Sequence, residues 1–384
     1  MLASKDHDLH RKRRAVLNPY FSQQSVRRLE PVINDTLSNL LFRMEGWGRA
    51  GEVVNMNVPF RAATKDIIQD CNAPFFDVLT PQRICHLGTH VYWLAWIMAR
   101  LPPSLMIALL PRVGVFAKFM QDLTAQIEHI RNAKEHPEGK TIFHEIIRSD
   151  IPDSEKETKR LADEAMVILI AGSETTASTL AAIMYHLLSD RPMLARLKKE
   201  LEDAFPDANQ LPDASKLDKL PFLNAIIQEA IRLYPGATHR QDRIAPDEDL
   251  VLESSDGGTF VIPAGTPVGM SPSTINRHPA LYGPDPDVFR PDRYLENPRL
   301  ARHNFSFSKG GRACIGMNLA CQELQSLTAG IFRKYDAFDP EATDQVGPTL
   351  ELFETVREDV AMYADYITIC PRPGSKGLRV KIRN

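Results

Sequence analysis

One cysteine stands in a frame of small residues at positions 305–316, and its thiol is the group in this stretch best suited to bind a metal. Cys314 can become a soft anionic ligand, because the thiolate rather than the thiol binds metal ions. Gly310 and Gly316 permit a tight turn and let the backbone approach a flat ligand closely, which a Cβ would hinder. Arg312 offers a permanent charge whose forked donors suit carboxylates. The stretch is therefore a candidate thiolate site.

The residues that follow this frame favour a helix that begins directly behind the sulfur. A thiolate is stabilised at such a helix N-terminus, and Phe307 supplies an aromatic wall. A buried structural cysteine is the commonest fate of a free thiol and is the plainer alternative. The complete frame, Phe307-x-x-Gly310-x-Arg312-x-Cys314-x-Gly316, favours ligation over that alternative.

This frame resembles the haem-binding loop of cytochrome P450 enzymes, with every constrained position filled. The resemblance implies that haem b is the cofactor and that Cys314 is the axial thiolate ligand of its iron. It also implies that Arg312 pairs with a haem propionate, and that Phe307, Gly310 and Gly316 shape the loop around the haem.

Polar residues at 171–176 interrupt an apolar helix that we expect over residues 161–188. On pattern alone, the interruption is equally a kink in which Thr hydroxyls bond back to carbonyls one turn earlier. The run is similar to the I-helix motif of the same family. That resemblance implies that Gly172 opens a groove for dioxygen, that Thr175 holds dioxygen by hydrogen bonding, and that Glu174 relays protons.

A basic segment at residues 4–22 is typical of a solvated helix face, with a site for an anionic partner as the second interpretation. It resembles the family's C helix, which implies that Arg14 holds a propionate, that His10 stands in the usual aromatic position, and that the surface docks the electron donor. In this register the chain starts near the C helix. We therefore expect a P450 fold truncated at its N-terminus, without the family's anchor and first helices.

Glu229 and Arg232 lie three residues apart on an expected helix, a spacing that by itself usually marks a surface ion pair. The resembled family has this pair on its K helix and completes a triad with a later arginine, which matches Arg293. The resemblance implies that the triad builds the haem pocket. Arg240 aligns with a position that often meets the second propionate.

Composition and patterning indicate one mainly α-helical domain over residues 1–384, with small β-sheets to one side. The chain is 43% hydrophobic and 25% charged with a formal charge of −3, which argues against nucleic acid as a partner. Five widely spaced cysteines favour a reducing compartment. We expect strands at 250–252 and 259–262, and a late hairpin that pairs 366–369 with 378–382.

An apolar stretch at residues 91–110 is broken by Arg100, Pro102 and Pro103, well short of the about twenty residues that a membrane span requires. Ordinary core is favoured over a surface that touches a membrane. In the resembled family this is the F–G region, which roofs the substrate pocket and rests on a bilayer. The resemblance implies the cytoplasmic face of the endoplasmic reticulum, with a cytoplasmic or peripheral location as the alternative.

The resemblance implies a fungal, microsomal-type haem-thiolate monooxygenase that inserts one atom of O2 into an apolar small molecule, such as a secondary metabolite. Electrons would come from NADPH-cytochrome P450 reductase, with cytochrome b5 as a further donor, because no glycine loop with nucleotide-binding spacing and so no reductase domain is found. The alternatives are a haem-thiolate isomerase or dehydratase, and a non-catalytic, truncated haem-binding fragment. Glu174 and Thr175 together favour monooxygenation.

Overall fold

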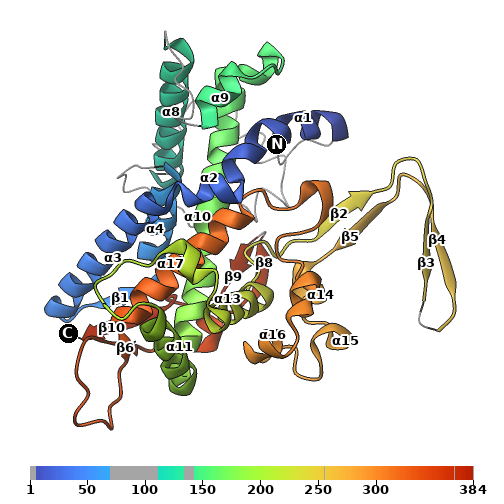
Figure 1. Cartoon of the computed structure of the whole chain (residues 1–384). Helices are drawn as coiled ribbons and strands as arrows, with labels where there is room; N and C mark the ends of the chain where they lie inside the picture. The colour runs from blue at the N-terminus through green and yellow to red at the C-terminus, as the bar shows by residue number, and fades with distance from the viewer. Residues whose placement is uncertain (1–5, 70–110, 134–141, 255, 367, 384) are drawn as a thin grey trace.

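The computed structural model describes residues 6–69, 111–133, 142–254, 256–366 and 368–383. The apolar stretch at 91–110, with the expected F–G region, lies outside these residues. Within them the chain is mainly α-helical with small sheets, as the sequence predicts (Figure 1).

The helices and the shorter 3-10 helices (η) follow one another from the first described residues to the last third of the chain. The α-helices are α1 (His7–Leu17), α2 (Gln23–Arg27), α3 (Glu30–Ala50), α4 (Asn57–Gln69), α8 (Pro111–Asn132), α9 (Ile142–Arg148), α10 (Thr158–Ser189), α11 (Arg191–Ala204), α12 (Ala214–Leu217), α13 (Pro221–Leu233), α14 (Pro272–Ile275), α15 (Pro279–Tyr282), α16 (Asp292–Glu296) and α17 (Met317–Lys334). The 3-10 helices are η1 (Asn18–Phe21), η2 (Asp153–Lys156), η3 (Pro298–His303), η4 (Gly310–Arg312) and η5 (Arg357–Asp359).

Helix α10 is the centre of the molecule, and α4, α8, α13 and α17 pack around it (Figure 1). Its apolar residues are distributed around the helix, so several faces must be covered by neighbours. Among the described helices it alone is long and apolar enough to cross a membrane by length and composition. A core helix passes the same test, and the helices around α10 identify it as one.

Within the described parts of the chain, four small sheets lie beside the helices. Strands β1 (Val53–Asn55), β10 (Arg379–Arg383), β7 (Thr349–Leu352) and β6 (Asp336–Ala337) form one sheet in that order. The two-stranded sheets are β2 (Gln241–Ile244) with β5 (Pro267–Met270), β3 (Leu250–Glu253) with β4 (Thr259–Ile262), and β8 (Ala364–Tyr366) with β9 (Thr368–Cys370). The sequence correctly predicts β3 and β4.

The late hairpin predicted between 366–369 and 378–382 is wrong. Strand β8 instead turns back directly onto β9, and β10 pairs antiparallel with both β1 and β7. Alternation shows that a segment can form a strand, but it does not identify the partner, because the partner is set by which edges the packed helices bring together.

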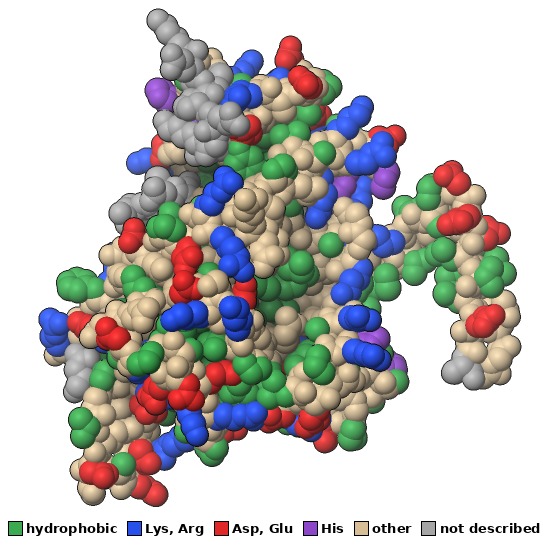
Figure 2. Space-filling view, viewed as in Figure 1, with side chains coloured by type: hydrophobic (Ala, Val, Ile, Leu, Met, Phe, Trp, Pro, Cys, Tyr) green, Lys and Arg blue, Asp and Glu red, His purple; other side chains and the backbone are tan. Residues whose placement is uncertain are grey.

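The β3–β4 ribbon stands away from the helical body (Figures 1 and 2). Its large apolar side chains are exposed: Val251 by 62%, Leu252 by 50%, Phe260 by 61% and Val261 by 58%. The two strands pair in register from Leu250 opposite Ile262 to Glu253 opposite Thr259. The ribbon is therefore held by its own backbone ladder and turn more than by packing.

A buried ionic cluster joins α13 to the segment after α15. Both Arg232 on the same helix and Arg293 on α16 bind the carboxylate of Glu229, with N–O distances of 2.8 and 3.0 Å. All three side chains are at most 2% exposed. The backbone N–H of Arg290 donates to the same carboxylate at 2.8 Å. The structure thus brings the predicted triad together as a buried cluster rather than a surface ion pair.

Helix α1 is tied to the body by Arg13, whose guanidinium donates two hydrogen bonds to Glu155 of η2 at 2.6 and 2.7 Å. Arg160 of α10 binds the same carboxylate at 3.2 Å. Arg13 and Glu155 are 18% and 13% exposed, so the pair is only partly screened by water. The basic face predicted to be solvated therefore also contributes an internal contact.

We expect Glu229→Ala to lower the free energy of unfolding by about 3–5 kcal/mol, because the substitution leaves two guanidinium groups buried without their anion. Urea denaturation measures this change. Glu202→Ala is the matched control: Glu202 is 52% exposed and lies 3.8 Å from Arg333, so its loss costs less than about 1 kcal/mol. Equal costs for both variants would contradict a structural role for the cluster.

We also expect the stabilisation by Glu155 to depend on pH. Hydrogen bonding from Arg13 is the main cause that holds the pKa of Glu155 below its usual value of 4.5. A depressed pKa gives stability that is present above pH 4.5 and is lost as pH falls through the folded-state pKa. Glu155→Gln should therefore cost about 1 kcal/mol at neutral pH and progressively less in acid. A difference between the two proteins that stays constant with pH would contradict this linkage.

Candidate active site

The Cys314 loop is closed by its own backbone. The N–H of Cys314 donates to the carbonyl of Phe307 at 2.8 Å, and the N–H of Ala313 donates to the carbonyl of Gly310 at 3.0 Å. Gly310 has a φ of +71°, in the left-handed region that favours glycine. Helix α17 then begins at Met317, directly behind the sulfur as predicted.

The thiol of Cys314 is exposed, yet the protein around it still desolvates it. This burial raises the pKa of Cys314, while the N–H of Gly316 and the charge of Arg14 act in the opposite direction. Cys314 has both properties, because its own surface is open and protein atoms still surround it. A bound metal cation would favour the thiolate directly.

The triad is connected to this loop through Asn276. Arg232 donates to the carbonyl of Asn276 at 2.7 Å. The Asn276 side chain accepts from the N–H of Phe305 and donates to the hydroxyl of Ser306, both at 2.8 Å. The buried cluster therefore fixes the start of the Cys314 loop.

Helix α1 brings its basic residues to the other side of the same loop. Arg14 donates to the carbonyl of Ala313 at 2.6 Å. His10, one turn earlier, is 6% exposed, and its pKa is lowered by burial first and then by the charges of Arg312 and Arg14. Arg14 therefore contacts the Cys314 loop directly, and His10 lies within the influence of both Arg14 and Arg312.

Arg240, the residue predicted to meet the second propionate, is mostly exposed instead. Its side chain is 68% exposed and forms an ion pair with Asp242 at 3.1 Å. Arg243, three positions further along, instead donates to the hydroxyl of Ser308 in the Cys314 loop at 2.8 Å. Sequence reasoning missed Arg243, because no strand was predicted at its position. Arg243 lies within β2, whereas Arg240 precedes that strand.

The polar run at residues 171–176 of α10 shows the local hydrogen bonding that is expected for a kink. The hydroxyl of Thr175 donates to the carbonyl of Ala171 at 2.7 Å, one turn earlier. A Cβ on Gly172 would lie 2.2 Å from the end of the Ile68 side chain. Gly172 therefore lets α4 approach α10 closely, which is a reason for a glycine other than the predicted dioxygen groove.

Glu174 is bound to a partner that the sequence did not reveal. Arg61 of α4 donates to both carboxylate oxygens, with distances of 2.7 and 2.8 Å. The two side chains are 22% and 14% exposed. The predicted proton relay would thus start from a carboxylate held by a guanidinium.

Two contacts place the Cys314 loop and Thr175 within one interior. Ile315, next to Cys314, packs against the hydrophobic cluster that contains Leu169 of α10. On the other side, Gly236 lies so close to Thr175 that an added Cβ would stand 2.4 Å from the Cβ of Thr175. Helix α10, the Cys314 loop and the segment after α13 therefore meet at this site.

The residues present fit a haem. Haem needs one protein ligand with basic groups for its propionates, and Cys314 with Arg14 and Arg312 provides both. An added Cβ on Gly311 or Gly316 would meet no protein atom within 4 Å, so the loop has open space on that side. Within the described residues, no group of three or more His, Cys, Asp or Glu could hold a metal ion instead.

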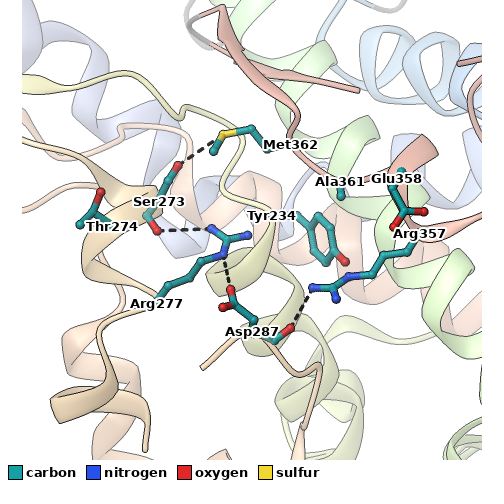
Figure 3. A pocket seen from close by; sticks show the side chains of 9 residues that line it. All are labelled: Tyr234, Ser273, Thr274, Arg277, Asp287, Arg357, Glu358, Ala361 and Met362. Carbon is teal, nitrogen blue, oxygen red and sulfur yellow. Dashed lines mark hydrogen bonds and ion pairs between the residues drawn. The ribbon is translucent and has the colours of Figure 1, made fainter. Parts of the chain in front are cut away.

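A separate cavity of about 440 Å³ lies at the end of α13 (Figure 3). Arg277 reaches from one wall to the carboxylate of Asp287 at 3.0 Å, and Arg357 donates to the carbonyl of Asp287 at 2.8 Å. The buried Tyr234 lines the cavity as well. None of the lining residues is among those predicted for the site.

Comparisons with a family model and with known proteins agree on one family. The family model described as "Cytochrome P450" matches residues 1–357. The chain is 38% identical to "Cytochrome P450 monooxygenase tpcC" of Cochliobolus heterostrophus, over 100% of this chain and 76% of that protein. It is 32% identical to "Fusicoccadiene C-8 hydroxylase" of Phomopsis amygdali, over 98% and 74% of the two chains. It is 31% identical to "N-acetyltryptophan 6-hydroxylase ivoC" of Emericella nidulans, over 99% and 76%.

Solved structures agree on the fold. The haem domain of cytochrome P450DA superposes with a TM-score of 0.70 at 22% identity, covering 98% of this chain and 76% of that one. Because its fold, its cysteine loop and its sequence relatives agree, the chain belongs to the cytochrome P450 family, among the fungal monooxygenases, and is an oxidoreductase.

Proposed function

We propose that residues 1–384 act as one haem-thiolate domain that binds haem b through Cys314 and inserts one oxygen atom of O2 into an apolar small molecule of fungal secondary metabolism. The observation that carries this proposal is the exposed thiol at the start of α17, with Arg14 at the loop's Ala313 carbonyl. When bound, the haem supplies the redox chemistry that activates dioxygen.

The protein's own residues would orient the cofactor and hold protons. Arg14 and Arg312 would pair with its propionates, and His10 would pack beside them. Phe307, Gly310 and Gly316 would shape the loop, and Arg243 would brace it through Ser308. The role of Arg240 at a propionate stays a prediction, because its ion pair with Asp242 points to a different partner.

Thr175 and Glu174 would interact with bound dioxygen. A hydroxyl and an acid beside bound dioxygen can donate hydrogen bonds and pass protons. The Thr175 hydroxyl now donates to Ala171, so it must rotate away to donate elsewhere. Glu174 must likewise share its carboxylate with Arg61 while a proton moves.

Electrons would come from outside the chain, from NADPH-cytochrome P450 reductase with cytochrome b5 as a further donor. Arg13 and Arg14 of α1 are used internally, whereas Arg11 and Lys12 are exposed on that helix. These two residues leave a basic surface for an acidic donor protein. We place the enzyme at the cytoplasmic face of the endoplasmic reticulum, in peripheral contact with the membrane.

The relatives support a hydroxylation. Two of them are named as hydroxylases, one of fusicoccadiene and one of N-acetyltryptophan. Their differing substrates are consistent with a shared oxygen chemistry and a variable pocket. We therefore propose the reaction class and leave the substrate at the level of an apolar small molecule.

Cys314→Ala should abolish the strongly red-shifted absorption band of the reduced protein under carbon monoxide, because that band would require the Cys314 thiolate as a ligand of bound haem. The measurement is a difference spectrum of the purified protein. Cys321→Ala is the matched control, since Cys321 lies on α17 as a second free thiol. An unchanged band in Cys314→Ala would overturn the proposed ligand.

Thr175→Val should lower the product formed per NADPH consumed on the order of ten-fold, because one hydrogen bond to a charged group contributes about 1.5 kcal/mol. Thr179→Val is the matched control: its hydroxyl bonds back to the carbonyl of Thr175 at 3.1 Å, one turn further along the same helix. Product and NADPH are measured together. Equal losses in both variants would show that only helix packing is affected.

A further inference from the structure

A carboxylate on β8, which the function proposed above does not use, joins two segments that lie far apart in the sequence. The hydroxyl of Thr238 donates to one oxygen of Asp365 at 2.6 Å. Nδ1 of His239 lies 3.3 Å from the other oxygen of the same carboxylate. Thr238 is 1% exposed, whereas the Asp365 side chain is 35% exposed. Asp365 therefore fastens β8 to the segment that follows α13.

The strand pair that carries this carboxylate is also anchored in the core. Ile369 of β9 lies directly opposite Asp365, so the two side chains share one face of the pair. Ile369 is 6% exposed and belongs to the hydrophobic cluster that contains Leu180 of α10. Strand β9 packs against α10 (Figure 1). The same face of the strand pair thus reaches the core through Ile369 and the segment after α13 through Asp365.

The segment after α13 leads from this carboxylate to Thr175. A Cβ added to Gly236 would lie 2.4 Å from the Cβ of Thr175 and 3.0 Å from its Cα, so the backbone at Gly236 lies directly against Thr175. Thr238 follows two residues later, which is at most about 7 Å of chain. The hydroxyl of Ser271 donates to the carbonyl of Thr238 at 3.3 Å. A shift of Thr238 would therefore move Gly236 and its contact with Thr175.

We propose that Asp365 is a positioning residue: it holds Thr238 and, through Gly236, keeps Thr175 in one arrangement beside bound dioxygen. The contacts start on α10 at the apolar cluster, pass through β9 and β8 to the segment after α13, and return to α10 at Thr175. This inference rests on the proposed function, and it deepens it by adding a residue that acts on Thr175 through others.

The first test asks whether Asp365 and Thr238 act together. Urea denaturation of the haem-loaded protein compares Asp365→Ala, Thr238→Val and the double variant. We expect the double variant to be about five-fold more stable, in its unfolding equilibrium constant, than the two single effects combined would give, because one hydrogen bond is lost in all three. Effects that simply combine would overturn the contact.

The second test uses carbon monoxide as the probe of Thr175. The infrared stretching band of carbon monoxide on reduced haem responds to hydrogen-bond donors beside the gas. We expect Asp365→Ala and Thr238→Val to shift or broaden this band, because Thr175 then takes more than one arrangement. Asp365→Asn should retain the wild-type band, since its amide oxygen still accepts from Thr238. A wild-type band in Asp365→Ala, or equal changes in Asp365→Asn and Asp365→Ala, would overturn the proposal.

Two comparisons separate positioning from a general loosening of the fold. Glu351 of β7 is a strand carboxylate of similar exposure, 32%, that pairs with Arg383 at 2.6 Å, and Glu351→Ala should leave the band unchanged. Gly236→Ala presses on Thr175 directly and should alter the band. An altered band in Glu351→Ala equal to that in Asp365→Ala would overturn the proposal, as would a band that changes in Gly236→Ala alone.

Failure of the proposed function gives a different result from failure of this inference. Without haem ligation by Cys314, the wild-type protein lacks the red-shifted absorption band under carbon monoxide. If only the inference fails, that absorption band is present, and Asp365→Ala leaves the infrared band as it is in the wild type.

Discussion

The site depends on a buried carboxylate that two arginines share. Glu229 binds Arg232 and Arg293 in the interior, and neither guanidinium could remain there without the anion. Arg232 then holds Asn276, whose amide holds Phe305 and Ser306. This sequence of contacts extends from α13 to the loop of Cys314. The cluster is thus the anchor of the site, and the ligand loop takes its position from it.

The site itself is divided between two helices that the fold packs together. Helix α17 carries the thiol loop at its N-terminus, and α10 carries Glu174 and Thr175 in its middle. Apolar packing contributes to their relative position, because residues of both helices belong to one hydrophobic cluster.

Basic residues have different tasks on the two faces of α1. Arg13 and Arg14 point into the protein, one to Glu155 and one to Ala313, while Arg11 and Lys12 stay at the surface. A run of four basic residues is thus used both to dock the helix and to leave a charged surface. Both tasks follow from the helical period, which turns successive residues toward different surroundings.

The sequence by itself determined the cysteine loop, the helix that follows it, the central apolar helix and the spacing of Glu229 and Arg232, whereas Arg293 was assigned through the resemblance to the family. These features are local, since glycine spacing, proline positions and hydrophobic period act over a few residues. Only the tertiary structure decided which distant groups meet: Arg61 with Glu174, Arg243 with Ser308, Ile68 with Gly172, and β10 with β1 and β7. Such partners depend on how whole helices and strand edges pack, and no short stretch of sequence carries that information.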